Sequence, residues 1–176
     1  MNSKTKEYSS LLIRYIILLL APLGNLIIFY TIFTPLTLYL SYFFINLFFE
    51  TSLYNSYLFF GTNAINMIPA CVAGAAYYLL LILNLSTREI PLQKRILLLI
   101  SSFASFLILN SLRIFFLALL LNYSLAYFNA LHLFFWYIMS TLFVVIIWFV
   151  HVKLFKIKAI PIYSDLLKLK KVLYKQ

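Results

Sequence analysis

The chain has 176 residues, of which 65% are apolar and only 10% are charged. A soluble domain cannot cover its surface with so few polar side chains, and a mean hydropathy of +1.01 is typical of an integral membrane protein. The formal net charge of +10 would indicate a nucleic-acid partner in a soluble protein. Here the cations flank apolar runs, so the sequence predicts a membrane protein, and no nucleic-acid partner is expected.

Thirteen of the fourteen Lys and Arg residues form three blocks. These are Lys4, Lys6 and Arg14; Arg88, Lys94 and Arg95; and Lys153, Lys156, Lys158, Lys168, Lys170, Lys171 and Lys175. Because basic residues stay on the cytoplasmic side, both termini and residues 88–95 are predicted to be cytoplasmic. The remaining cation, Arg113, lies inside an apolar run, where a charge is costly and marks a functional site.

The apolar runs predict an all-α integral membrane protein with about four transmembrane helices. The first covers residues 15–33, a retained signal anchor with a kink at residues 22–25. A Thr-Pro pair should then break the helix, and residues 36–49 would extend only about 21 Å, so a short interfacial helix is predicted there. The other predicted spans are residues 69–86, 95–121 and 132–152.

The connecting segments complete the predicted topology. Residues 51–68 contain no Lys or Arg and should form an outside loop, with a small hairpin at residues 58–65 around a Gly-Thr-Asn turn. Residues 122–131 are predicted to form a second outside turn. The chain thus divides into a transmembrane domain, residues 1–152, and a basic cytoplasmic tail, residues 153–176. The tail is either an amphipathic helix on the inner leaflet or a solvated segment that enforces topology.

Three polar residues should reach one depth in the membrane. Counted from the nearest basic block at about 1.5 Å per helical residue, Cys71 lies roughly 25 Å from the inner surface, Arg113 roughly 27 Å and His132 roughly 31 Å. The hydrocarbon core is about 30 Å thick, so all three lie near its outer edge. Three different spans therefore bring a thiol, a guanidinium and an imidazole to one level.

This group of residues is suited to nucleophilic acyl transfer. A helix N-terminus and a nearby cation both favour the thiolate form of Cys71, which would attack a peptide carbonyl. His132 would exchange the proton with the thiol and protonate the leaving amine. Arg113 would stabilise the thiolate or the oxyanion. Asn110, three residues before Arg113 on the same helical face, would orient it or donate to the same oxygen.

Each residue also has a purely structural interpretation. Cys71 lies among Ala and Gly residues and suits a close helix contact. His132 suits the membrane interface, Asn110 a hydrogen bond between helices, and Arg113 a side chain that extends to lipid headgroups. The shared depth is what favours a site. With one cysteine and no cluster of metal ligands in the sequence, neither a disulfide within the chain nor a metal or other cofactor is expected.

At these residues the sequence resembles the exosortase/archaeosortase family of membrane cysteine transpeptidases. The matching elements are Pro-Ala-Cys71-Val-Ala-Gly74-Ala-Ala-Tyr77-Tyr78, then Asn110-Ser-Leu-Arg113-Ile, then His132. The resemblance covers roughly residues 35–150 and is to short archaeal-type members of the pacearchaeosortase kind. It implies that Cys71, Arg113 and His132 are catalytic.

The resemblance also implies partners and a location. The substrates would be exported proteins that end in a recognition motif, a transmembrane helix and a basic cluster. The new C-terminus would pass to an amine, that of a membrane lipid headgroup, near the extracytoplasmic face of the plasma membrane. Two alternatives stay open: a hydrolytic intramembrane cysteine protease with the same residues, and a non-enzymatic assembly factor or small transporter.

Overall fold

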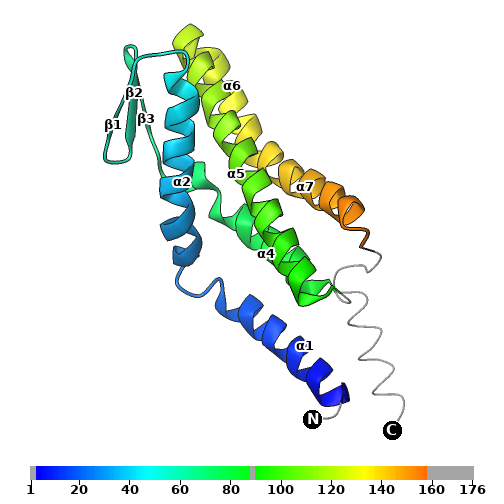
Figure 1. Cartoon of the computed structure of the whole chain (residues 1–176). Helices are drawn as coiled ribbons and strands as arrows, with labels where there is room; N and C mark the ends of the chain where they lie inside the picture. Colours follow the sequence, from blue (N-terminus) through cyan, green and yellow to red (C-terminus); the bar gives the residue numbers. More distant parts are fainter. Residues whose placement is uncertain (1–2, 88–89, 158–176) are drawn as a thin grey trace.

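A computed structural model of the chain describes residues 3–87 and 90–157 (Figure 1). Its helices are α1 (Ser3–Leu20), α2 (Ile27–Asn46), α3 (Pro69–Val72), α4 (Gly74–Ser86), α5 (Leu92–Tyr123), α6 (Leu125–Phe134) and α7 (Ser140–Leu154), with a π-helical segment, η1 (Phe135–Met139), between the last two. Its strands are β1 (Thr51–Tyr54), β2 (Tyr57–Phe60) and β3 (Asn63–Asn66). Arg88 and most of the predicted tail lie outside the described residues.

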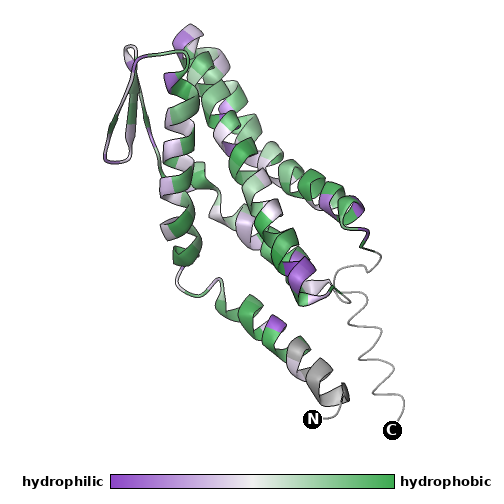
Figure 2. Ribbon diagram, in the orientation of Figure 1, coloured by the Kyte–Doolittle hydropathy of each residue, from purple (hydrophilic) through white to green (hydrophobic). Residues whose placement is uncertain are grey.

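Four helical segments of the described chain are long and apolar enough to cross a membrane. They are Ile27–Asn46, Pro69–Ser86, Leu92–Tyr123 and Leu125–Leu154. Figure 2 shows hydrophobic residues along nearly their whole length. The predicted number of spans is therefore confirmed by length and composition, which fit a multi-pass membrane protein.

The position predicted for the first span is wrong. The structure divides residues 15–33 between two helices, because α1 ends at Leu20 and α2 begins at Ile27. Pro22 lies at the start of the connection, and Gly24, Asn25 and Leu26 all have positive φ angles, between 57° and 81°. Three successive left-handed residues cannot continue a right-handed helix, so the chain turns where only a kink was predicted.

The separate short helix predicted at residues 36–49 is also wrong. Most of this run belongs to α2, which continues through Pro35 to Asn46. Proline removes one helical hydrogen bond, but a helix tolerates this loss where neighbouring helices pack against it. Here α2 packs along α5 with a buried face that runs from Phe29 to Ile45. Tertiary packing thus outweighs the local effect of the proline.

The last long helix begins earlier than predicted. Residues 122–131 do not form an outside turn, because α5 extends to Tyr123 and α6 starts at Leu125 after a single extended residue, Ser124. His132, predicted to open the span, lies instead in the last turn of α6.

A small antiparallel sheet replaces most of the predicted outside loop. Strands β2 and β3 form the predicted hairpin, with Phe60 opposite Asn63 and a two-residue turn between them. The sequence did not predict β1, which pairs with the other side of β2 to give the order β1-β2-β3. Leu58 and Phe60 of β2 are buried against the helices, and the sheet lies at the side of the bundle, beside the C-terminal half of α2 (Figure 1).

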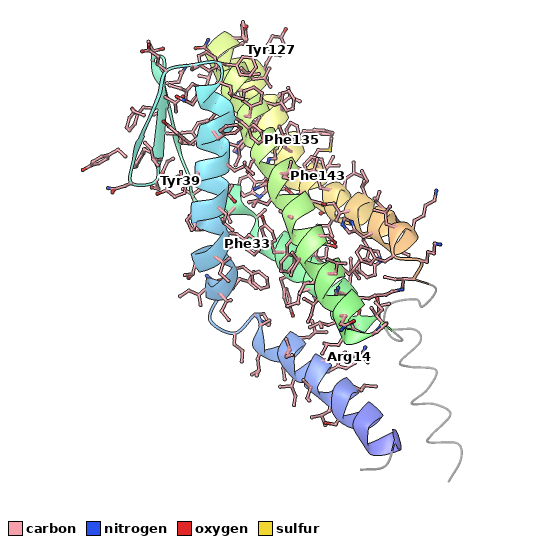
Figure 3. All side chains as sticks on the ribbon, viewed as in Figure 1. Arg14, Phe33, Tyr39, Tyr127, Phe135 and Phe143 are labelled. Carbon is pink, nitrogen blue, oxygen red and sulfur yellow. The ribbon has the colours of Figure 1, made fainter. Side chains whose placement is uncertain are left out.

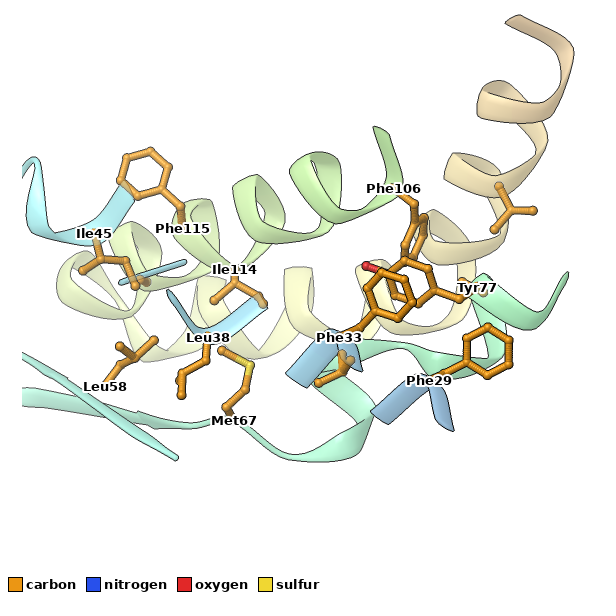
Figure 4. Close-up of a cluster of buried hydrophobic side chains, with 14 of the residues drawn as sticks. Phe29, Phe33, Leu38, Ile45, Leu58, Met67, Tyr77, Phe106, Ile114 and Phe115 are labelled. Carbon is orange, nitrogen blue, oxygen red and sulfur yellow. The ribbon is translucent and has the colours of Figure 1, made fainter. Parts of the chain in front are cut away.

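The core lies between α2, α4 and α5 and continues to the sheet (Figure 4). Near its centre the ring of Phe33 stacks on that of Tyr77 with centroids 3.7 Å apart, and Phe106 meets Tyr77 edge-on at 4.8 Å. Beneath the sheet, Leu58 packs in the same cluster as Ile114. These contacts fix the rotation of each helix about its axis, which decides which polar residues face each other.

Two arginines converge on the end of α4. Arg14 of α1 donates to the carbonyl oxygens of Leu85 and Thr87, at 3.0 and 3.1 Å. Arg95 of α5 donates to the carbonyl oxygen of Asn84 and, at 2.8 Å, to that of Thr87. The last carbonyls of a helix lack partners within it, so these two buried cations complete the hydrogen bonding of α4. Figure 3 shows Arg14 at this end of the molecule, away from the sheet.

Candidate functional site

Cys71 lies on a one-turn helix followed directly by a break. Pro69 occupies the first turn of α3, as predicted, and Ala73 after it has a left-handed conformation, φ 58° and ψ 50°. The next residue, Gly74, lies so close to the Tyr30 ring that a Cβ atom there would be 2.8 Å from it. A side chain at position 74 would therefore require the Tyr30 ring to shift. The Cys71 side chain is half-buried and contacts the carbonyl oxygen of Asn66, with its sulfur 3.9 Å away.

Asn110 joins Cys71 to Arg113. Its side-chain nitrogen donates to the main-chain oxygen of Cys71 at 2.8 Å, and its side-chain oxygen accepts from a terminal nitrogen of Arg113 at 3.4 Å. The contact predicted between Asn110 and Arg113 is therefore present. The bond to Cys71 adds a connection that the sequence could not supply, because the two residues are far apart in the chain and lie on different helices. One buried amide thus links the Cys71 segment to the cation.

Arg113 is buried at 4% exposure, although it carries a positive charge. The same terminal nitrogen that contacts Asn110 also donates to the Ser140 hydroxyl at 3.3 Å, and the guanidinium lies 5.9 Å from the centre of the Phe135 ring. Figure 3 shows Phe135 beside α5. Nε has no hydrogen-bond partner, and no carboxylate pairs with Arg113 within the described residues. A buried cation with only neutral partners can attract a negative charge that forms during a reaction.

His132 lies beyond Arg113, on α6. Its ring is stacked on that of Phe128, with ring centroids 5.4 Å apart, and lies tilted against the Trp136 ring, with centroids 6.1 Å apart. Arg113 lies near enough to Cys71 and His132 for its charge to attract a thiolate at the first and to repel an imidazolium at the second. The structure therefore gathers the three residues around the guanidinium. It does not place the thiol and the imidazole in a hydrogen bond with each other, as far as the described side chains extend.

Ser140 and Phe135 are site residues that the sequence analysis missed. Phe135 begins η1, a π-helical turn, and Ser140 follows it as the first residue of α7; π turns inside helices are frequent at functional sites. Ser140 donates to the carbonyl oxygen of Phe135, five residues earlier, and at the same time accepts from Arg113. A single hydroxyl in an apolar run gives little signal, so only the fold could reveal this role.

A cavity of about 310 Å³ adjoins the site. Ala70 and Ala73, from the segment that carries Cys71, line it together with Trp136 of η1 and Ser140 at the start of α7. Tyr30 of α2 also lines it. The cavity therefore lies between the segment that carries Cys71 and the hydroxyl that binds Arg113.

No protein-family model, curated protein or solved structure matches this chain.

Proposed function

We propose that the protein is a membrane cysteine transpeptidase that removes C-terminal sorting signals from exported proteins. His132 takes the proton of the Cys71 thiol, the thiolate attacks a peptide carbonyl of the substrate, and the carbonyl π electrons move to oxygen. When the tetrahedral intermediate collapses, the C–N bond breaks, and the leaving amine takes a proton from His132. A thioester remains between the substrate and Cys71.

The second half of the reaction releases the product. An amine, from a lipid headgroup in this proposal, attacks the thioester carbonyl and gives its proton to His132 as the C–S bond breaks and the thiolate re-forms. The new amide joins the protein to its acceptor. If water attacks in place of the amine, the same residues act as a hydrolytic protease, which is the second candidate.

The observation that carries the proposal is the arrangement around Arg113. This buried cation lacks an anionic partner in the described chain, lies near both Cys71 and His132, and is linked to the Cys71 segment through Asn110. Such an arrangement supports stabilisation of a thiolate or of an oxyanion. The imidazole and the thiol would complete their contact when a substrate is bound, as catalytic hydrogen bonds commonly tighten in the complex.

The test compares Cys71→Ala with the wild-type protein in the same cells. Mass spectrometry of C-terminal peptides from membranes and medium would identify the proteins that lose a C-terminal apolar helix only when Cys71 is present. Cys71→Ala removes little volume beside the Ala-rich segment, so the variant should fold and insert at the normal level. Unchanged C-termini in the two strains would remove the transpeptidase proposal and favour an assembly factor or transporter.

Two further variants test the roles of the partners. Arg113→Ala and His132→Ala should each abolish the processing that depends on Cys71, and the double variant should be hardly worse, because residues that act as one unit give non-additive losses. His132→Ala would also accumulate a thioester adduct if release needs the imidazole more than attack does. The mass of the new C-terminus separates the candidates: an added amine indicates transfer, and a free carboxylate indicates hydrolysis.

A further inference from the structure

Strand β3 is an edge strand with free main-chain groups. In the order β1-β2-β3 it pairs on one side only, with β2. The amide of Met67 donates to the carbonyl of Ser56 at 2.8 Å, directly beyond the pair Tyr57 and Asn66. Hydrogen-bonded and non-bonded pairs alternate in an antiparallel ladder, so Asn63 and Ile65 bond to β2, while the amides of Ala64 and Asn66 point away from it. Both of these residues are exposed.

This edge leads directly to the candidate nucleophile. The carbonyl oxygen of Asn66, the last residue of β3, is the group that contacts the Cys71 sulfur. The start of the strand is held by α5, because Asn63 donates to Asn122 at 3.4 Å, and the Cys71 segment that follows the strand is held by α5 through the bond from Asn110 to the Cys71 carbonyl. The free amides therefore have a fixed position relative to the thiol.

We propose that the β3 edge binds the substrate polypeptide as an added strand and so delivers the bond to be cleaved to Cys71. This inference rests on the proposed function and concerns how the same site recognises its substrate. An unpaired strand edge is a ready template for an extended peptide, and main-chain hydrogen bonds provide affinity with little dependence on sequence. In parallel pairing, Ala64 bonds to the two substrate residues on either side of the one opposite it, and the following substrate residues run toward Asn66 and the thiol.

A peptide accounts for this edge better than a second copy of the chain does. Pairing of two β3 edges would cover the carbonyl that contacts Cys71 in both copies and would leave no route for a substrate along the strand. A substrate strand, in contrast, uses the edge and the thiol together. The edge would recognise the main chain of an extended segment that precedes an apolar helix, with little dependence on the side chains of that segment.

The test removes one outward amide at a time. Proline lacks the N–H group and is tolerated on an edge strand where that group faces away from the sheet. Ala64→Pro should reduce Cys71-dependent processing about tenfold, as expected for one lost main-chain hydrogen bond, while Ala64→Thr, which keeps the amide, should stay within about twofold of wild type. The reporter is the protein that shows the largest Cys71-dependent processing in the comparison above, expressed with the full-length enzyme.

A second position, a control variant and two control measurements separate loss of binding from loss of folding. Asn66→Pro should behave like Ala64→Pro. Ile65→Pro removes an amide that bonds to β2, so it should lower the melting temperature, whereas Ala64→Pro should leave both the melting temperature and the rate of Cys71 alkylation near wild type. Equal processing by Ala64→Pro and Ala64→Thr would overturn the inference. So would a wild-type dimer that Ala64→Pro converts to a monomer without loss of processing.

The two proposals fail in different ways. If Cys71→Ala still processes the reporter, the proposed function fails, whatever β3 does. If Cys71→Ala abolishes processing and Ala64→Pro does not, the transpeptidase proposal stands and strand addition is wrong.

Discussion

The side-chain amide of Asn110 donates to the main-chain oxygen of Cys71 at 2.8 Å. In an unbroken helix this oxygen would accept from the amide four residues later, but the left-handed residue Ala73 prevents that bond. Asn110 therefore satisfies a carbonyl that the break leaves open, and its other end meets Arg113. The break, the amide and the cation form one structural unit.

Replacement of Asn110 by leucine should destabilise the protein. The side chain is buried at 1% exposure, and its loss leaves the Cys71 carbonyl without a partner and Arg113 with fewer acceptors. The expected cost is about 1–3 kcal/mol, measurable as a lower melting temperature of the purified protein in detergent. Asn129→Leu is the matched control, because that amide is exposed on α6 and should change stability by less than about 0.5 kcal/mol. Equal stability of the two variants would contradict the bridging role.

The thiol of Cys71 should react faster in the presence of Arg113. A neighbouring cation favours the thiolate, which is the nucleophilic form. Alkylation by a membrane-impermeant reagent should be severalfold slower in Arg113→Gln than in wild type. Lys94→Gln removes one positive charge at an exposed residue in the first turn of α5, nineteen residues before Arg113. This variant should leave the alkylation rate unchanged. The same rate in Arg113→Gln and wild type at every pH would exclude this influence on the thiol.

Arg14 and Arg95 should show coupled effects on stability because they share the Thr87 carbonyl as an acceptor. Either arginine can still bond that carbonyl when the other is replaced by alanine, so it is left open only in the double variant. Each single variant should lower the free energy of unfolding by about 1–3 kcal/mol. The loss in the double variant should exceed the sum of the two single losses by at least about 0.5 kcal/mol.

A second pair of substitutions provides the control for this coupling. Arg14→Ala combined with Asn110→Leu should be additive, because these residues lie on different elements and have different hydrogen-bond acceptors. Melting or denaturation in detergent would measure both cycles. Additive losses for Arg14 and Arg95 would show that the shared acceptor contributes no coupling.

The topology predicts which residues an impermeant reagent can reach. The turn at Thr62 and the start of α6 lie at one end of the molecule, because β3 bonds to Asn122 at the end of α5. Lys94 lies at the start of α5, at the opposite end. In a Cys71→Ala background, Thr62→Cys and Asn129→Cys should be labelled on intact cells, and Lys94→Cys should be labelled only after the membrane is opened. Labelling of Thr62→Cys and Asn129→Cys from opposite sides would contradict the topology.

The sequence alone determined the number of helices long and apolar enough to cross a membrane, and the polar residues that form the candidate site. Hydropathy and charge depend on composition over a short window, so four apolar helices and an isolated cation at Arg113 could be found by counting. The hairpin of β2 and β3 was predictable for the same reason, since a short Gly-containing turn between apolar runs is a local signal.

Only the tertiary structure decided which helix ends where and which side chains meet. Pro35 predicted a break but lies inside α2, because the helix packs along α5, while the chain turns at Gly24 to Leu26. Counting along a helix gives the depth of a residue but not its direction around the axis. That direction is fixed by packing between distant segments, and so the bond from Asn110 to Cys71 and the contact of Ser140 with Arg113 could not be predicted from any one of those segments.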